Sequence, residues 1–204
     1  MSHPAGEPPQ ARHRRQRYLT PEEANALLDE LGQHSEVTHD MAVMALDCGL
    51  RFGEIAELKA KDCDFDRRLI LIRDPKARVN RFAFMTERFK AILAERCDDA
   101  PKGYLFTNRY GEKMDRISNT FRRAADDLFN QDVTDNRQKV CFHSLRHTFA
   151  SWLVEEGTPL YTVKELMGHS DFSMTQRYSH LAPEALQAAV AVLEAKSQKV
   201  QARG

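Results

Sequence analysis

The chain has 204 residues, of which 42% are hydrophobic and 29% charged, and its 30 basic and 30 acidic residues give a formal net charge of zero. This size and composition indicate one globular domain with tails rather than a fibrous or disordered protein. The sequence contains no apolar run of the roughly 18 residues that a membrane-spanning helix needs, and its N-terminus lacks the apolar stretch of a signal peptide, so no membrane contact and a cytoplasmic location are expected.

The first elements predicted along the chain are helices. Residues 1–17 are rich in Pro, Gln and Arg and show no hydrophobic period, which predicts a disordered lead-in or linker ahead of a domain over residues 18–204. A helix is predicted from Thr20, the N-cap of a capping box closed by Glu23, to about Leu31. Residues 39–49 predict a buried helix that ends at Gly49, and a short helix is expected over residues 52–58.

The middle of the chain predicts an antiparallel hairpin with a basic tip. The apolar runs 69–72 and 82–85 flank a polar segment that contains Pro and Asn. Between Arg67 and Lys90 the chain carries eight basic and two acidic residues, an excess of six positive charges (8 − 2). Such clusters are what phosphate binding requires, although a basic run alone is more often a solvated surface.

The rest of the chain is predicted to be helical. Helices are expected over residues 86–97, 118–129, 144–157 and 158–168, and Gly157 and Gly168 are expected to end the last two. Residues 173–176 predict another capping box, and a final helix over residues 184–199 shows a second apolar stripe. The predicted fold class is therefore mainly α with a small antiparallel β-sheet (α+β).

Four short stretches carry the side chains of chemical interest: residues 48–55, the hairpin, residues 143–148, and Gly168-His169 with Tyr178 nine residues later. Each has an ordinary structural explanation when it is taken alone. Arg51 can be a surface residue paired with Glu54, for example, and His169 a helix cap. Residues 143 and 147 are histidines at a metal-ligand spacing, but no motif supplies a third ligand, and the four cysteines show no CxxC pattern. No metal or cofactor is therefore expected, and the cysteines are expected to be free thiols.

Together, however, these stretches resemble the tyrosine recombinases, the family of phage integrases and chromosome-dimer resolvases. The resemblance rests on Gly-Leu-Arg-x-x-Glu, a hairpin lysine, His-x-x-Arg-His-Thr, Gly-His and Tyr-Ser-His, and covers about residues 18–195. It implies the catalytic-domain fold of that family without the N-terminal core-binding domain, so the chain is expected to be a truncated form or a natural fragment. The catalytic residues it implies are two phosphate-gripping arginines, Arg51 and Arg146, two histidines, His143 and His169, the hairpin Lys76 and the nucleophile Tyr178.

The resemblance also implies the reaction, which is cleavage and rejoining of double-stranded DNA through a 3′-phosphotyrosyl link. Guanidinium groups suit the charge that develops on a phosphodiester under attack. His143 is a candidate base for the tyrosine, and Lys76 a candidate acid for the leaving 5′ oxygen. Low affinity for DNA is expected of this chain alone, and self-assembly on DNA into a tetrameric synapse through the C-terminal helix is expected. Further candidate DNA contacts are Arg73, Arg78 and Arg81.

Three other functions remain open at this point. A type IB topoisomerase-like activity would use the same chemistry to relax supercoils. A non-catalytic DNA-binding protein that retains the fold is a second alternative, although all six candidate positions hold suitable residues. A helix-turn-helix regulator is the third, and it leaves the hairpin lysine and the spacing from Gly-His to Tyr178 without explanation.

Overall fold

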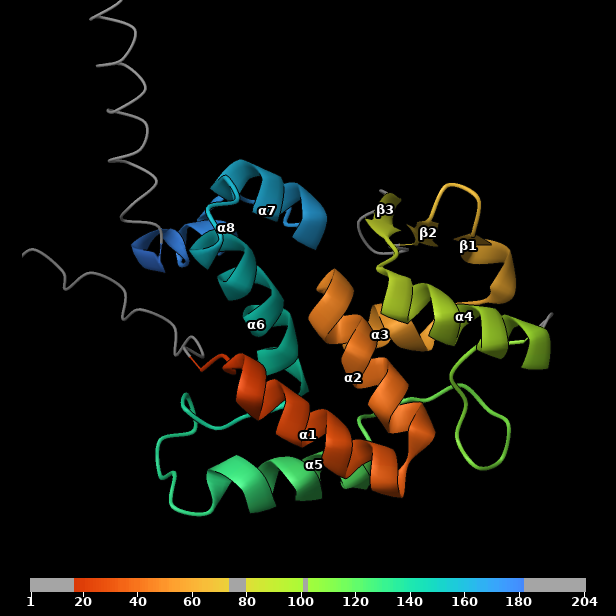
Figure 1. The fold of residues 1–204 in the computed structure, drawn as a ribbon, viewed down its shortest axis with the longest axis horizontal. Coiled ribbons are helices and arrows are strands. Elements are labelled where there is room, and N and C mark those ends of the chain that lie inside the picture. The colour runs from red at the N-terminus through yellow and green to blue at the C-terminus, as the bar shows by residue number, and fades with distance from the viewer. Residues whose placement is uncertain (1–16, 74–79, 101–102, 182–204) are drawn as a thin grey trace, which may run out of the picture.

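The computed structural model describes residues 17–73, 80–100 and 103–181, and Figure 1 traces them from the N-terminal helix to the C-terminal turns. Over these residues the fold is mainly α with one small antiparallel sheet, as predicted. No helix among them is long and apolar enough to cross a membrane. The elements are α1 (Pro21–His34), α2 (Glu36–Cys48), α3 (Phe52–Ala56), β1 (Cys63–Asp64), β2 (Leu69–Ile72), β3 (Arg81–Phe84), α4 (Glu87–Asp99), α5 (Asn119–Ala125), α6 (Phe142–Glu155), α7 (Leu160–Met167) and α8 (Ser173–Gln176).

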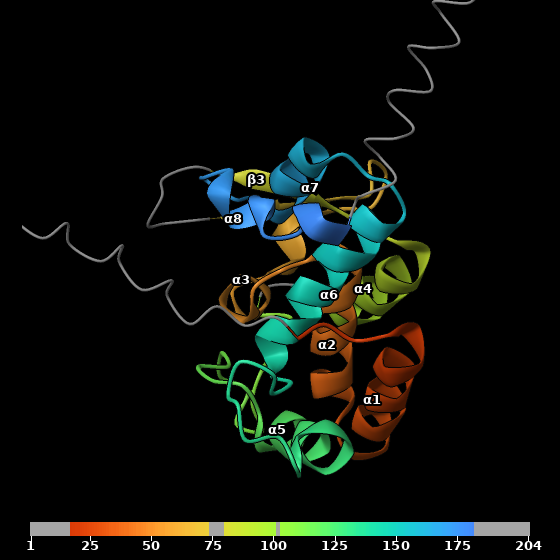
Figure 2. The ribbon, with the colours of Figure 1, turned by 90° about the vertical axis from the view of Figure 1, so that its left-hand side faces the viewer.

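Helix α2 is the centre of the fold. Nine of its thirteen residues are buried, and it packs against α1, α3, α4 and α6. Figure 2 shows α2 and α6 running between α1 and α5 at one end and α7, α8 and β3 at the other. The pair α2–α6 therefore brings the end of α2, around residue 49, close to α6 and to the segments that follow it.

The predicted hairpin is present, and a third strand extends it. The strand order is β1-β2-β3, and Ile70 of β2 pairs with Ala83 of β3. Both of these side chains are buried, whereas Phe82 and Phe84 on the opposite face are more than half exposed. The two-residue strand β1 was not predicted, because so short a segment has no recognisable alternation. The tip of the hairpin, residues 74–79, lies outside the described residues, and with it Lys76 and Arg78.

Most predicted helix ends are confirmed by their backbone. Thr20 accepts from the Glu23 N–H, and the Glu23 carboxylate accepts from the Thr20 N–H, so the capping box is formed. Gly49, Gly157 and Gly168 have φ of 62°, 80° and 62°, the left-handed conformation that ends a helix without strain only at glycine. Helix α2 begins at residue 36, earlier than predicted, because Ser35 caps it.

One predicted cap is wrong. Ser173 does not cap a helix with its side chain; it is the first residue of α8. The start of this helix is fixed instead by Asp171, whose carboxylate accepts from the Ser173 N–H at 2.9 Å. The chain then continues in turns, and the Tyr178 N–H donates to the Thr175 carbonyl. The predicted final helix, residues 184–199, lies outside the described residues.

Candidate active site

Arg146 lies at the centre of the candidate site. It is carried by α6 and is only 1% exposed. Its guanidinium donates to the carbonyl of Gly49, at the end of α2, and to the carbonyl of Met167, at the end of α7, the latter at 2.6 Å. The last carbonyls of a helix have no partner within that helix, so both are natural acceptors. Arg146 therefore joins three helices, and burial together with the charge of Arg51 lowers its pKa to about 9.

A single carboxylate, Glu54 in α3, faces three guanidinium groups. It accepts from Arg51 at 2.9 Å and from Arg81 at 2.9 Å, and it lies 3.9 Å from Arg146. It also accepts from the backbone N–H of Arg51, which fixes the start of α3. Three cations around one partly buried anion leave a net positive charge, which suits the binding of an anionic group.

The hydroxyl of Tyr178 is buried and has a specific partner. Tyr178 is 4% exposed, and its Oη lies 2.6 Å from Nδ1 of His147 on α6. Burial raises the pKa of Tyr178 to about 12, although Arg177 and Arg146 oppose the shift. Burial and then the neighbouring His143 lower the pKa of His147 to about 3. At neutral pH the phenol is therefore protonated and donates to a neutral imidazole, whose own proton must be on Nε2.

The two predicted histidines lie beside this pair. The ring of His143 meets the ring of His147 edge to face, with centroids 4.7 Å apart. His169 is buried, and its Nδ1 lies 2.7 Å from the hydroxyl of Thr175. Burial, followed by the charges of Arg146 and Arg51, lowers the pKa of His169 to about 3. Its environment thus includes both predicted phosphate-gripping arginines.

The structure therefore brings together five of the six predicted catalytic residues. Arg51 and Arg146 share Glu54, and Tyr178 and His143 both contact His147. Lys76, the sixth, lies outside the described residues. No group of three or more His, Cys, Asp or Glu side chains placed to hold a metal ion occurs in the described parts of the chain.

The hairpin arginines that the structure describes differ in their surroundings. Arg73 is exposed and forms an ion pair with Asp62 at 2.7 Å. Arg81 is largely buried in the site, where it pairs with Glu54. Its side chain also packs directly against Gly168, and a Cβ on Gly168 would lie 2.2 Å from the Nε of Arg81. Arg78 is outside the described residues. A DNA contact by any of the three remains a prediction.

The sequence analysis did not single out His147, Glu54 or Arg177 as site residues. The spacing of four between His143 and His147 was the available signal, since it places both on one face of a helix. Glu54 was foreseen only as a partner of Arg51. Arg177 precedes the tyrosine directly, and its buried Nε has no hydrogen-bond partner, so a donor inside the site remains unsatisfied.

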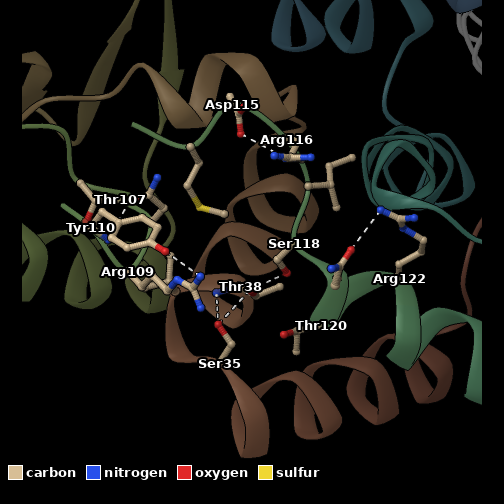
Figure 3. Close-up of a pocket in the computed structure, with 15 residues that line it drawn as sticks. Ser35, Thr38, Thr107, Arg109, Tyr110, Asp115, Arg116, Ser118, Thr120 and Arg122 are labelled. Carbon is tan, nitrogen blue, oxygen red and sulfur yellow. Dashed lines mark hydrogen bonds and ion pairs between the residues drawn. The ribbon is translucent and has the colours of Figure 1, made fainter. Parts of the chain in front are cut away.

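A second polar hollow, of about 840 Å³, is formed by the start of α2, the loop around residue 109 and the start of α5 (Figure 3). None of the candidate catalytic residues lines it. Thr38 and Ser118 are joined there by a hydrogen bond of 2.9 Å. Arginine side chains and hydroxyl groups dominate its wall, which suits a phosphate backbone better than an apolar ligand. Its arginines are Arg109, Arg116 and Arg122.

The fold is that of a tyrosine recombinase catalytic domain. The crystal structure of XerA recombinase matches 91% of this chain with a TM-score of 0.64 and 26% identity, and 66% of that chain is covered. The catalytic domain of bacteriophage HP1 integrase matches 85% of this chain, also with a TM-score of 0.64 and 26% identity, and 93% of that domain is covered.

The chain belongs to the phage integrase family, whose sequence profile matches residues 17–185. It is 32% identical over 175 residues to the tyrosine recombinase XerA of Thermococcus onnurineus, covering 84% of this chain and 60% of that protein. It is 30% identical over 191 residues to the integrase of Salmonella phage P22, covering 87% of this chain and 47% of that protein. The chain thus spans about half to three fifths of the length of these curated relatives.

Proposed function

We propose that this chain is the catalytic domain of a site-specific DNA recombinase or integrase, which breaks and rejoins double-stranded DNA through a 3′-phosphotyrosyl link to Tyr178. The observation that carries the proposal is the burial of the Tyr178 hydroxyl in the same cluster as Arg51, Arg146 and two histidines. The family membership supports it. The same family makes the cytoplasm the proposed location.

Binding of the scissile phosphate is assigned to Arg51 and Arg146. Arg146 is held by two backbone carbonyls, so its position is set before any phosphate arrives. Preorganised cations need no rearrangement as negative charge builds up on the pentacoordinate phosphorus. Removal of one such donor typically slows a reaction by about 10²–10³-fold. Glu54 keeps the guanidinium of Arg51 in place while leaving the cluster positively charged.

Attack by the Tyr178 oxygen on phosphorus forms the phosphotyrosyl bond and breaks the bond to the 5′ oxygen. That oxygen leaves readily only if it receives a proton, and Lys76 remains the proposed donor. The new bond is itself a phosphodiester, so a 5′ hydroxyl from another strand can reverse the step. Neither a metal nor a cofactor is part of the proposed reaction.

Duplex DNA is the proposed partner. An integrase of the transposon Tn1549, solved in complex with transposon right end DNA, shares the fold with a TM-score of 0.72 over 91% of this chain, at 23% identity and with 68% of that chain covered. The arginine-lined hollow of Figure 3, at the start of α2 and so at the other end of that helix from the active site cluster, offers a further set of phosphate contacts. We include in the proposal low DNA affinity of the chain alone and assembly into a tetramer on DNA through the segment 184–199.

The proposal is tested with a duplex that is nicked next to a candidate recombination site, so that a short fragment diffuses away after cleavage and traps the intermediate. A covalent protein–DNA adduct is expected, and it should be absent for Tyr178→Phe. Tyr161 is 67% exposed and outside the cluster, so Tyr161→Phe is the matched control and should form the adduct normally. An adduct that survives Tyr178→Phe would refute the assignment. Supercoil relaxation without two-site recombination would favour the topoisomerase-like alternative.

A further inference from the structure

The group at hydrogen-bond distance from the Tyr178 hydroxyl is His147. The distance from Oη to Nδ1 is 2.6 Å, well inside the range of a strong hydrogen bond. The ring of His143 packs against the ring of His147 in an edge-to-face arrangement. A proton that leaves the phenol therefore has an acceptor already in place, and geometry is the first requirement for a base.

We propose that His147 is the general base of the reaction, taking the proton from Tyr178 through Nδ1 as the tyrosine oxygen attacks phosphorus. The inference rests on the proposed function. The O–H bond of the phenol breaks, the oxygen–phosphorus bond forms, and the bond from phosphorus to the leaving oxygen breaks. His147 becomes an imidazolium with a proton on each nitrogen, and it returns the proton to the phenol when a 5′ hydroxyl reverses the step.

The surroundings of His147 keep this base inactive in the empty site. Four cationic or titratable groups act on it: His143 and Arg146 from its own helix α6, His169 after α7, and Arg177 beside Tyr178. Burial and then the field of these groups make protonation of the imidazole unfavourable, and the phenol retains its proton. The empty site therefore holds no isolated phenolate that water could protonate or that could attack a wrong electrophile.

A bound phosphate reverses this balance. The phosphate is anionic and would enter among the same arginines, so it offsets the positive charge that opposes protonation of His147. The unsatisfied Nε of Arg177 is one donor that such an anion could occupy. The same anion also disfavours a full phenolate, which is why transfer of the proton must accompany attack. Base strength thus increases when substrate is present, without a rearrangement of the protein.

The experiment separates activation of the tyrosine from protonation of the leaving group. The probe is a pool of duplexes of randomised sequence whose 3′ phosphate carries a 4-nitrophenyl ester. Attack by Tyr178 releases coloured 4-nitrophenolate, which needs no proton to leave. Lys76→Ala should therefore slow this release less than it slows cleavage of ordinary DNA. His147→Asn and His147→Ala should each slow it by about 10²-fold or more, the usual range for loss of a general base.

Two variants distinguish a base from a residue that only holds the hydroxyl. The amide oxygen of His147→Asn can still accept the Tyr178 hydrogen bond but cannot take the proton. Release by this variant at nearly the wild-type rate would overturn the proposal. Should it fail to fold, added imidazole decides the matter: partial rescue of His147→Ala, increasing with the neutral fraction of imidazole, is expected, and no rescue counts against the base.

The same assay also tests the proposed function separately from the role of His147. Release that persists in Tyr178→Phe would show that another group attacks the phosphate, and it would remove the basis for both proposals. Tyr161→Phe, which changes an exposed tyrosine, should release 4-nitrophenolate at the wild-type rate. Loss of release in Tyr178→Phe together with normal release in His147→Asn would overturn only the role of His147.

Discussion

The state of His147 predicts how the stability of the protein changes with pH. Its folded-state pKa is about 3, whereas an unperturbed histidine titrates near 6.5. Between these values the unfolded chain binds a proton that the folded chain does not, so acid favours unfolding. The contribution of His147 is fully present above pH 6.5 and is lost as the pH falls toward 3. From pH 7 to pH 5 the loss is about 2 kcal/mol of unfolding free energy.

Urea unfolding at pH 7 and pH 5 measures this loss when wild type is compared with His147→Asn. The asparagine does not titrate, so the variant should lose about 2 kcal/mol less than wild type over the same interval. His34→Asn, on the surface of α1, is the matched control. It should leave the loss of unfolding free energy between pH 7 and pH 5 unchanged, because the His34 side chain is largely exposed. Equal pH dependence in wild type and His147→Asn would refute the buried, neutral state of His147.

Three further variants examine other parts of the site. Glu54→Gln should lower the unfolding free energy by about 1–3 kcal/mol and slow adduct formation, because three guanidiniums lose their shared anion. Glu57→Gln, which removes the carboxylate of an exposed ion pair, should change the unfolding free energy by less than about 1 kcal/mol. Urea unfolding measures both. Gly49→Ala should lower the unfolding free energy by more than about 1 kcal/mol, since its Cβ would lie 2.5 Å from the ring of Phe149. Gly111 has a similar φ but open space around it, so Gly111→Ala should lower the unfolding free energy by less. Arg177→Met should weaken stabilisation of the protein by sulfate in thermal melts, whereas Arg96→Met, already paired with Asp40, should not.

The sequence predicted what depends on local pattern. The capping box at Thr20, the glycine ends of α2, α6 and α7, and the paired strands β2 and β3 all follow from short-range rules, and all are present. The capping box predicted at Ser173 is wrong because two residues compete for one role. The carboxylate of Asp171 accepts from the Ser173 N–H, and residues 173–176, which were expected to cap a helix, are themselves helical.

The candidate site was predictable in its residues but not in its contacts. The motifs supplied Arg51, His143, Arg146, His169 and Tyr178 as a set, yet no pattern states which of them touch. The contact between His147 and Tyr178 spans 31 residues and depends on how α6 packs against the turns after α8. Tertiary packing of this kind decides which histidine meets the hydroxyl, and spacing along one helix does not.

The way the helices end explains why so many positive charges can be gathered in this fold. α2 and α7 end at glycines in the left-handed conformation, and the freed carbonyls around these ends accept from the buried Arg146. Backbone carbonyls satisfy a guanidinium without neutralising it, in contrast to a carboxylate. Among the described residues, Glu54 supplies the negative charge that is paired with this cluster, and it is shared among three arginines. Burial, and then the electrostatic repulsion that remains, lowers the pKa of Arg146, His147 and His169 alike, and an anionic substrate would relieve the repulsion. A fold that paired each arginine with its own carboxylate would be more stable when empty, but it would have no preference for a phosphate.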